Sequence, residues 1–178
     1  MAGFLLIAAS LVLAPAAEAR NARKAHAAQS TASRQILNVR SAVLMDARTG
    51  KILYSQNPDV RIPPASLTKI MSMMVTFDAI RSGKVKLSDQ IRVSRHAARQ
   101  GVSRMGLRAG ERVSLNRLLM GMAVSSGNDA SMAVAERVGG SGRAFVKMMN
   151  NKARQIGMSS STFKTPNGLP AAGQYTTA

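Results

Sequence analysis

The sequence predicts a single α+β domain, because short strand-like runs come first along the chain and longer helical patterns follow them. Two apolar runs flank a turn-forming cluster within residues 41–55, and four helical stretches are predicted between residues 66 and 156. The length of 178 residues suits one domain with a short appendage, and 46% of the residues are hydrophobic. A chain of this size can bury a core without disulfides or a structural metal.

The first predicted element is a β-hairpin. Residues 41–45 and 51–55 are short apolar runs, and the sequence Asp46-Ala-Arg-Thr-Gly50 between them has the composition of a turn. A further short strand is predicted at residues 91–93.

The first predicted helix follows a pair of prolines. Pro63 and Pro64 block a helix before Ser66, and the helical pattern runs from Ser66 to about Ile80. Its apolar residues lie most of the way round the helix, which predicts that the helix is buried inside the domain. These residues are Leu67, Ile70, Met71, Met73, Met74, Phe77 and Ile80.

Three more helices are predicted in the second half of the chain. Ser114 is expected to cap the second helix, whose apolar residues recur at positions 115, 118, 119 and 122. A turn at residues 125–127 ends this helix. The third helix is predicted at residues 128–139 and the fourth at residues 143–156, with glycines after each.

The N-terminus has the pattern of an export signal. Residues 4–13 form an apolar run that is too short to span a bilayer comfortably, since about 20 apolar residues are needed, and Ala17-Glu-Ala19 offers a cleavage site. The sequence therefore predicts a signal peptide at residues 1–19 and a basic, disordered linker at residues 20–37. Export places the protein in the periplasm or cell envelope. The alternative is that the apolar run is a buried helix of the domain.

The amino-acid composition indicates which kinds of ligand and partner the protein is expected to bind. The chain has 25 Lys and Arg against 8 Asp and Glu, a net charge of +17, which favours anionic surroundings. The basic residues are scattered, and aromatic residues make up 3%, so we expect a basic globular surface and no nucleic-acid site. Because there is no cysteine and only two histidines, we expect neither a metal site nor a cofactor.

The segment Ser66-Leu-Thr-Lys69 can carry chemistry. Ser66 and Lys69 are three residues apart, so on a helix they share one face. A lysine whose pKa is lowered by burial can act as the base that activates a serine hydroxyl, and the Ser66 backbone N–H at the helix start could meet an oxyanion. The simpler interpretation is a helix cap and a surface lysine. The spacing also occurs at Ser161 and Lys164, in a loop.

A second candidate segment is the turn Ser126-Gly-Asn128. Its structural interpretation is a capping turn, with Gly127 at positive φ and Asn128 as the helix cap. Its functional interpretation places the Ser126 hydroxyl beside Lys69 as a proton relay and assigns to Asn128 a hydrogen bond with a substrate amide. The two interpretations are compatible, because a turn between rigid helices can position a site.

These segments resemble the D-alanyl-D-alanine carboxypeptidases, the low-molecular-mass penicillin-binding proteins of the serine β-lactamase-like superfamily. The resemblance rests on Arg61-Ile-Pro-Pro-Ala-Ser-Leu-Thr-Lys-Ile-Met-Ser72 and on the Ser126 triplet, with support from the hairpin and from Thr165-Pro-Asn-Gly-Leu-Pro170, where the family more usually has His-Gly-Leu. It covers residues 38–178. It implies a helical cluster packed on an antiparallel sheet, which would be incomplete here because the C-terminal strands are missing.

The resemblance also implies a function. The chain would be a serine-type carboxypeptidase that trims peptidoglycan pentapeptides and binds β-lactams, with Ser66 as the acylated nucleophile, Lys69 as the base, Ser126 as the relay and Asn128 as a substrate ligand. A peripheral association with the inner membrane is a further expectation. The family's third motif, Lys-Thr-Gly, does not occur in the 178 residues. The alternative is therefore a non-catalytic homologue that at most binds the cell wall or a partner.

Overall fold

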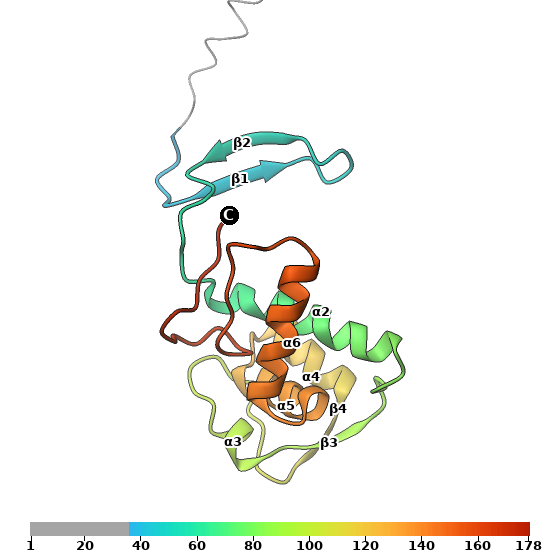
Figure 1. Cartoon of the computed structure of the whole chain (residues 1–178). Helices are drawn as coiled ribbons and strands as arrows, with labels where there is room; N and C mark the ends of the chain where they lie inside the picture. The colour runs from blue at the N-terminus through green and yellow to red at the C-terminus, as the bar shows by residue number, and fades with distance from the viewer. Residues whose placement is uncertain (1–35) are drawn as a thin grey trace, which may run out of the picture. The chain divides into compact units, whose positions relative to one another are not determined.

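The computed structural model describes residues 36–178 (Figure 1). The predicted signal peptide at residues 1–19 and the predicted linker as far as residue 35 lie outside the described residues. The chain divides into two units, Met1–Asn38 and Val39–Ala178, and the elements below all belong to the second. In the part of the chain that the structure describes, no helix is both long and apolar enough to cross a membrane.

The predicted hairpin is confirmed. Strand β1 (Ala42–Met45) pairs antiparallel with β2 (Ile52–Gln56). The turn between them is held by the Asp46 carboxylate, which accepts hydrogen bonds from the backbone N–H groups of Arg48 and Thr49, and Gly50 has a φ of +71°. Only glycine adopts such a φ without a steric cost, so the turn sequence determines where the hairpin reverses.

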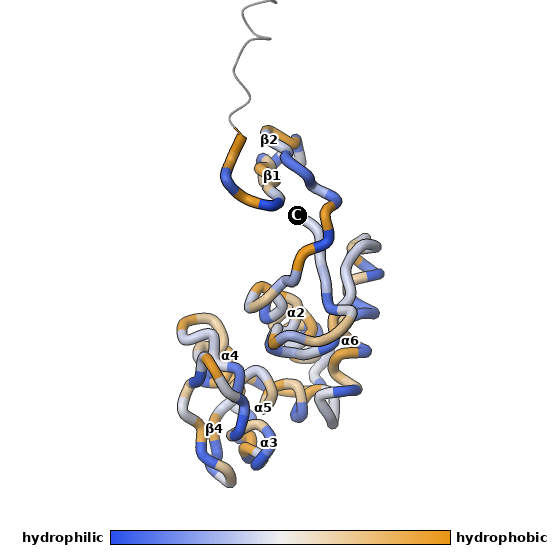
Figure 2. The backbone as a smooth tube through the Cα atoms, turned by 90° about the vertical axis from the view of Figure 1, so that its left-hand side faces the viewer, coloured by the Kyte–Doolittle hydropathy of each residue, from blue (hydrophilic) through white to orange (hydrophobic). Residues whose placement is uncertain are grey.

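Four helices form the main body of the second unit. They are α2 (Thr68–Arg81), α4 (Leu115–Val124), α5 (Asn128–Gly139) and α6 (Gly142–Gln155), and the three later ones agree closely with the predicted ranges. Helix α5 packs against α2, α4 and α6 (Figures 1 and 2). It contains three alanines and Ser131, whose small side chains let neighbouring helices approach closely. The largest fully buried apolar side chains include Leu115, Leu118, Phe145 and Met149.

A second two-stranded sheet precedes α4. Strand β3 (Gln90–Arg92) matches the predicted short strand within one residue, and it pairs antiparallel with β4 (Arg112–Ser114), which was not predicted. The short helix α3 (Arg95–Ala98) lies between them in sequence and packs on α5. Ser114 accepts a hydrogen bond from the Arg117 N–H at 3.3 Å and so caps α4 as predicted. The expected α+β class is confirmed.

The first helix differs from its prediction in two respects. It begins with a separate 3₁₀ turn, η1 (Ala65–Leu67), so Ser66 precedes the α-helix. The prediction of burial on all sides is wrong, because Leu67, Ile70 and Phe77 are exposed. The buried face instead carries Thr68, Lys69, Ser72 and Thr76 along with apolar residues. Hydrogen bonds offset the cost of burying two of these hydroxyls, since Ser72 donates to Pro166 O at 2.6 Å and Thr76 to Ser72 O at 2.8 Å. The buried Thr68 hydroxyl has no such partner among the described residues.

The turn between α4 and α5 also differs from its prediction. Ser126, not Gly127, has the positive φ, at +52°, whereas Gly127 has a φ of −59° and occupies the N-cap position of α5. Glycine is favoured at 127 for a different reason. A Cβ atom there would lie 3.0 Å from an Asp129 carboxylate oxygen and 3.2 Å from the Met105 nitrogen. The close approach of the Met105 backbone to position 127 favours glycine there, and sequence spacing does not reveal this approach.

Asp129 ties the start of α5 to the preceding loop. Its carboxylate is fully buried and accepts hydrogen bonds from the N–H groups of Met105, Gly106 and Leu107 at 2.8–3.0 Å. Burial opposes ionisation and by itself would raise the pKa, but these bonds and one from Ala130 outweigh it, so the pKa of Asp129 lies below its ordinary value.

We expect Asp129→Ala to destabilise the protein by about 3 kcal/mol at neutral pH, because four backbone donors lose their partner. The lowered pKa means that the stabilisation is complete above pH 3.8, the ordinary value, and is lost as pH falls through the folded-state pKa. Urea unfolding at several pH values measures this. The gap between parent and Asp129→Ala should shrink below pH 3.8. Asp59→Ala, a change at an exposed residue, should leave stability nearly unchanged at neutral pH. A gap that is constant down to pH 2 would contradict the assignment.

Candidate active site

Three of the predicted site residues meet at the N-terminal end of α2. Ser66 lies in η1, Lys69 in the first turn of α2, and Ser126 in the turn between α4 and α5. Lys69 Nζ lies 3.3 Å from Ser66 Oγ, and the Ser126 hydroxyl donates to Ser66 Oγ at 3.0 Å. The Ser66 hydroxyl oxygen therefore contacts both an amine and a second hydroxyl, one of them 60 residues away in sequence.

Lys69 is buried, so the alternative of a surface lysine is wrong. Its side chain is 3% exposed, and Nζ donates to Asn167 O at 2.8 Å. In the described part of the chain Lys69 forms no salt bridge. Desolvation disfavours the charged form, so burial lowers the pKa of Lys69 from its ordinary value of 10.5. A lysine in this environment can present a neutral amine to the Ser66 hydroxyl.

One residue of this cluster and one residue beside it have strained backbones. Ala65, directly before Ser66, has a φ of +46°, and Ser126 has a φ of +52°. Positive φ is uncommon for residues other than glycine, and such strain concentrates at functional sites. Both residues help to define the position of the Ser66 hydroxyl.

The loop at residues 165–170 completes the cluster, and sequence reasoning did not assign it a role. Pro166 O accepts hydrogen bonds from Ser72 at 2.6 Å and from Ser131 at 2.7 Å, so hydroxyls on α2 and α5 hold the loop. The next carbonyl, that of Asn167, accepts the Lys69 amine. The sequence signal was the turn-forming pair Asn167-Gly168, but nothing local links that pair to a lysine 98 residues away.

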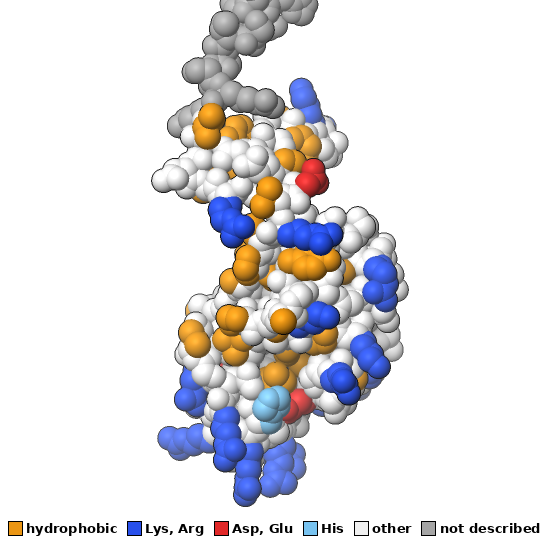
Figure 3. Space-filling model, turned by 60° about the vertical axis from the view of Figure 1, so that its left-hand side comes forward, with side chains coloured by type: hydrophobic (Ala, Val, Ile, Leu, Met, Phe, Trp, Pro, Cys, Tyr) orange, Lys and Arg blue, Asp and Glu red, His pale blue; other side chains and the backbone are white. Residues whose placement is uncertain are grey.

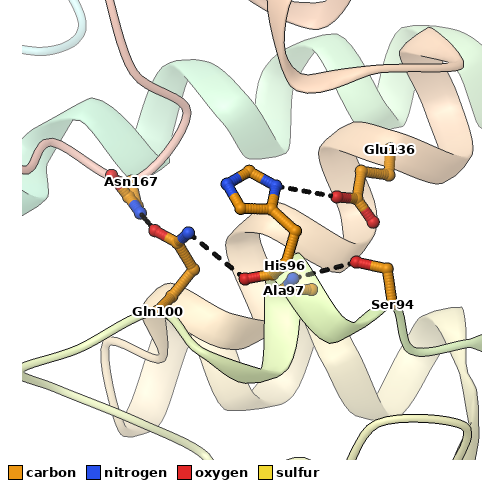
Figure 4. Close-up of polar contacts among 6 residues, drawn as sticks. All are labelled: Ser94, His96, Ala97, Gln100, Glu136 and Asn167. Carbon is orange, nitrogen blue, oxygen red and sulfur yellow. Dashed lines mark hydrogen bonds and ion pairs between the residues drawn. The ribbon is translucent and has the colours of Figure 1, made fainter.

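The Asn167 side chain extends this network to α3 (Figure 4). Asn167 is 2% exposed, and its amide donates to Gln100 Oε1 at 3.0 Å. Gln100 in turn donates to His96 O at 3.3 Å, and the His96 ring nitrogen Nδ1 lies 3.1 Å from Glu136 Oε1 on α5. The Asn167 carbonyl that contacts Lys69 is thus held in place in two ways. Gln100 binds the side chain of Asn167 itself, and Ser72 and Ser131 bind the carbonyl of the preceding residue, Pro166.

Asn128 is brought to the same region but not into contact with Ser66. It is 4% exposed, and its side-chain amide donates to Gly101 O at 2.9 Å. It does not cap α5 through its side chain, which corrects the predicted cap. Asn128 lines a cavity of about 420 Å³ together with Ser66, Val102, Ser103 and Asn167.

Ser66 is accessible from two sides. Besides the cavity that it shares with Asn128, it lines a groove of about 530 Å³ whose walls include Lys69, Ile70, Met73 and Ser126. The second serine–lysine pair of the sequence has no such setting. Ser161 forms a 2.8 Å hydrogen bond with Thr176 Oγ1, and it lies in an irregular segment with Lys164.

Gly168 is the residue of this loop that tolerates substitution least. Its φ is +87°, and a Cβ atom would lie 1.8 Å from Ala65 O and 3.0 Å from Thr68 Oγ1. We expect Gly168→Ala to destabilise the protein by at least about 2 kcal/mol more than a matched control, because the loop must move away from η1. Gly106→Ala is that control, with a φ of +85° and no atom within 4 Å of the added Cβ. Equal losses of stability in denaturant unfolding would show that the close approach to Ala65 is unimportant.

Comparisons with known proteins show which family the chain belongs to. The sequence profile of the D-alanyl-D-alanine carboxypeptidases (peptidase family S11) matches residues 27–178. Over 139 residues the chain is 47% identical to the D-alanyl-D-alanine carboxypeptidase DacF of Bacillus subtilis, covering 78% of this chain and 36% of the relative. Over 160 residues it is 40% identical to DacC of Escherichia coli, covering 86% and 40%.

Solved structures give the same result for the fold. The D-alanyl-D-alanine carboxypeptidase DacD from Francisella tularensis matches with a TM-score of 0.79 and 44% identity, over 82% of this chain and 35% of that one. Penicillin-binding protein 5 from Haemophilus influenzae matches with a TM-score of 0.77 and 37% identity, over 80% and 42%. The fold is thus that of the penicillin-binding DD-peptidases, and the chain spans about two fifths of the length of such relatives. The chain belongs to the D-alanyl-D-alanine carboxypeptidase family.

Proposed function

We propose that the chain carries the nucleophile and the base of a serine-type D-alanyl-D-alanine carboxypeptidase that trims peptidoglycan stem peptides. The observation that carries the proposal is the contact of Ser66 Oγ with the buried Lys69 amine at 3.3 Å and with the Ser126 hydroxyl at 3.0 Å. A serine hydroxyl becomes a nucleophile when a neighbouring base takes its proton, and a desolvated lysine can be that base.

In the proposed reaction, neutral Lys69 takes the proton of Ser66 as Oγ attacks the carbonyl carbon before the terminal D-alanine. The Ser66 backbone N–H, at the start of η1, supports the oxyanion. Ser126 passes the proton to the leaving amine, so the peptide bond breaks and D-alanine departs. Water then attacks the Ser66 ester, and its proton returns through the same groups. Asn128 orients the substrate amide from the wall of the cavity.

We further propose that the protein acts outside the cytoplasm, in the periplasm or cell envelope, after removal of residues 1–19. The support is the apolar run that ends before Ala17-Glu-Ala19, together with a substrate class that belongs to the cell wall. N-terminal sequencing of exported protein should give Arg20 as the first residue. A cytoplasmic product that keeps Met1 would contradict both the signal and the wall substrate.

Labelled penicillin tests the assignment of the nucleophile. In a form of the protein that is extended beyond Ala178 through a Lys-Thr-Gly strand, we expect one adduct, on Ser66, located by mass spectrometry of a peptic digest. Ser66→Ala should lose the label and Ser161→Ala should keep it, because Ser161 is engaged with Thr176. An adduct on Ser161 would refute the assignment.

Release of D-alanine distinguishes the second candidate function, a non-catalytic homologue that binds the wall. Lys-Thr-Gly, the family's third motif by resemblance, does not occur in the 178 residues, so the test uses the extended form. The extended form should release D-alanine from a peptide that ends in D-alanyl-D-alanine, and Ser66→Ala should not. If the extended form binds this peptide without releasing D-alanine, the non-catalytic function is the correct one.

A further inference from the structure

A second and larger cavity lies behind the loop that contacts Lys69. Its volume is about 880 Å³, compared with about 420 Å³ for the cavity that Ser66 shares with Asn128. The two cavities use opposite halves of one loop. Lys164, Thr165 and Pro166 line the larger cavity, whereas Asn167 and Gly168 line the smaller one. None of the groups proposed to act in catalysis lines the larger cavity.

Three cations surround this cavity. Arg143 and Lys147 lie one turn apart on α6, and Lys164 lies on the loop. All three are exposed, and none forms a salt bridge in the described part of the chain. The one carboxylate in the lining, that of Glu136, already has His96 Nδ1 at 3.1 Å. The wall therefore presents more positive than negative charge.

The lining between these cations is largely apolar. Met132 is 7% exposed, Val146 packs against the hydrophobic core, and Pro166 is buried. Figure 3 shows this part of the surface around His96, the histidine drawn in pale blue, with apolar side chains nearby and Lys and Arg side chains on either side. The partly exposed Val146 offers apolar surface between the cations that a small inorganic anion would not cover, so a ligand that joins carboxylates through an apolar body fits better.

We propose that the cavity formed by Arg143, Lys147, Lys164, Met132, Val146 and Pro166 binds an acidic peptide segment. Carboxylate side chains of the segment pair with the three cations, and an apolar residue between them covers Met132, Val146 and Pro166. The site is separate from the proposed catalytic function and does not depend on it.

The binding site is also connected to Lys69 through the shared loop. Pro166 contributes to the cavity wall, its carbonyl is held by Ser72 and Ser131, and the next carbonyl accepts the Lys69 amine. A ligand against Pro166 therefore contacts the opposite side of the segment that holds Lys69. Occupancy of the cavity should change the surroundings of the Gly168 N–H, which donates to Thr165 Oγ1 at 3.1 Å across the same loop.

The test is a titration of the ¹⁵N-labelled chain with the blocked peptide acetyl-Glu-Leu-Glu-amide, followed by amide chemical shifts. We expect saturable shifts at Lys147, Lys164 and Gly168. The peptide acetyl-Gln-Leu-Gln-amide and inorganic phosphate should each bind about tenfold more weakly, which corresponds to about 1.4 kcal/mol. Raising the salt concentration should weaken the binding of the acidic peptide, because exposed ion pairs are screened.

Matched variants locate the binding. The double variant Arg143→Ala, Lys147→Ala should bind the acidic peptide about tenfold more weakly, which is again about 1.4 kcal/mol. Arg117→Ala with Lys84→Ala removes the same charge from exposed residues outside the cavity and should leave affinity within about twofold, since distant exposed charges are screened. Equal losses in the two double variants, or equal binding of the glutamine peptide or of phosphate, would overturn the proposed site. Binding in the cavity without any shift at Gly168 would overturn the connection to Lys69. No outcome depends on catalysis.

Discussion

Replacing Lys69 by arginine is expected to lower the rate of Ser66 acylation by about 10³-fold in the extended form of the protein, although the positive charge is kept. Arginine remains protonated at any working pH, so it cannot take the Ser66 proton. Lys69→Met removes the amine without placing a guanidinium in a site that is 3% exposed, and it should lose activity to the same degree. Agreement between the two variants would assign the loss to the missing base and not to a buried charge.

The measurement is the time course of penicillin labelling, with thermal unfolding of each variant as a control for folding. Ser126→Ala should lower the rate of acylation less than either Lys69 variant does, because a water molecule can take the place of a relay hydroxyl. Lys84→Arg, a change at an exposed lysine, should have no effect. If Lys69→Arg is acylated at the parental rate, another group is the base.

The same assignment predicts a direction for pH dependence. Burial lowers the pKa of Lys69 from 10.5, so the neutral amine is populated at lower pH than for an exposed lysine. Acylation should rise with pH as Lys69 loses its proton and level off above its folded-state pKa. In Lys69→Met the residual rate should lack this rise.

The 178-residue chain by itself is expected to be acylated at least about 10²-fold more slowly than the form extended through Lys-Thr-Gly, since losing one oxyanion donor alone has an effect of that size. The resemblance assigns to that motif the second oxyanion N–H and the cation that holds the substrate carboxylate. In the described structure the groove beside Lys69 and Ser126 is lined on one wall by Ile70, which is 54% exposed. Among the described residues that line this groove, Lys69 is the one basic residue, and it is already assigned as the base.

Penicillin labelling of the two forms side by side checks this expectation. An extended form whose Lys-Thr-Gly lysine is replaced by alanine is the matched control, and its rate should fall toward that of the short chain. Stoichiometric labelling of the short chain at the rate of the extended form would contradict the prediction. It would mean that η1, α2 and the turn at Ser126 contain every group that acylation needs.

Local patterns in the sequence were sufficient for most of the secondary structure. The hairpin follows from two short apolar runs around Asp46 and Gly50, and α4 follows from its Ser114 cap and its apolar spacing. These features act between residues close in sequence, where periodicity and turn chemistry are reliable guides. Strand β4 was missed because the three residues Arg112–Ser114 show no such pattern, and their structure depends on pairing with β3.

The sequence by itself also determined that Ser66 and Lys69 are close, since a spacing of three residues places them on one face, and the pattern of Pro63-Pro64 and the following helix marked this segment out. Only the tertiary structure decided what surrounds them. The Asn167 carbonyl reaches Lys69 from 98 residues away, Ser126 reaches Ser66 from 60, and the residue with strained backbone is Ser126 rather than Gly127. Burial and hydrogen bonding of a lysine depend on which distant segments pack against it, and periodicity along one helix carries no information about those segments.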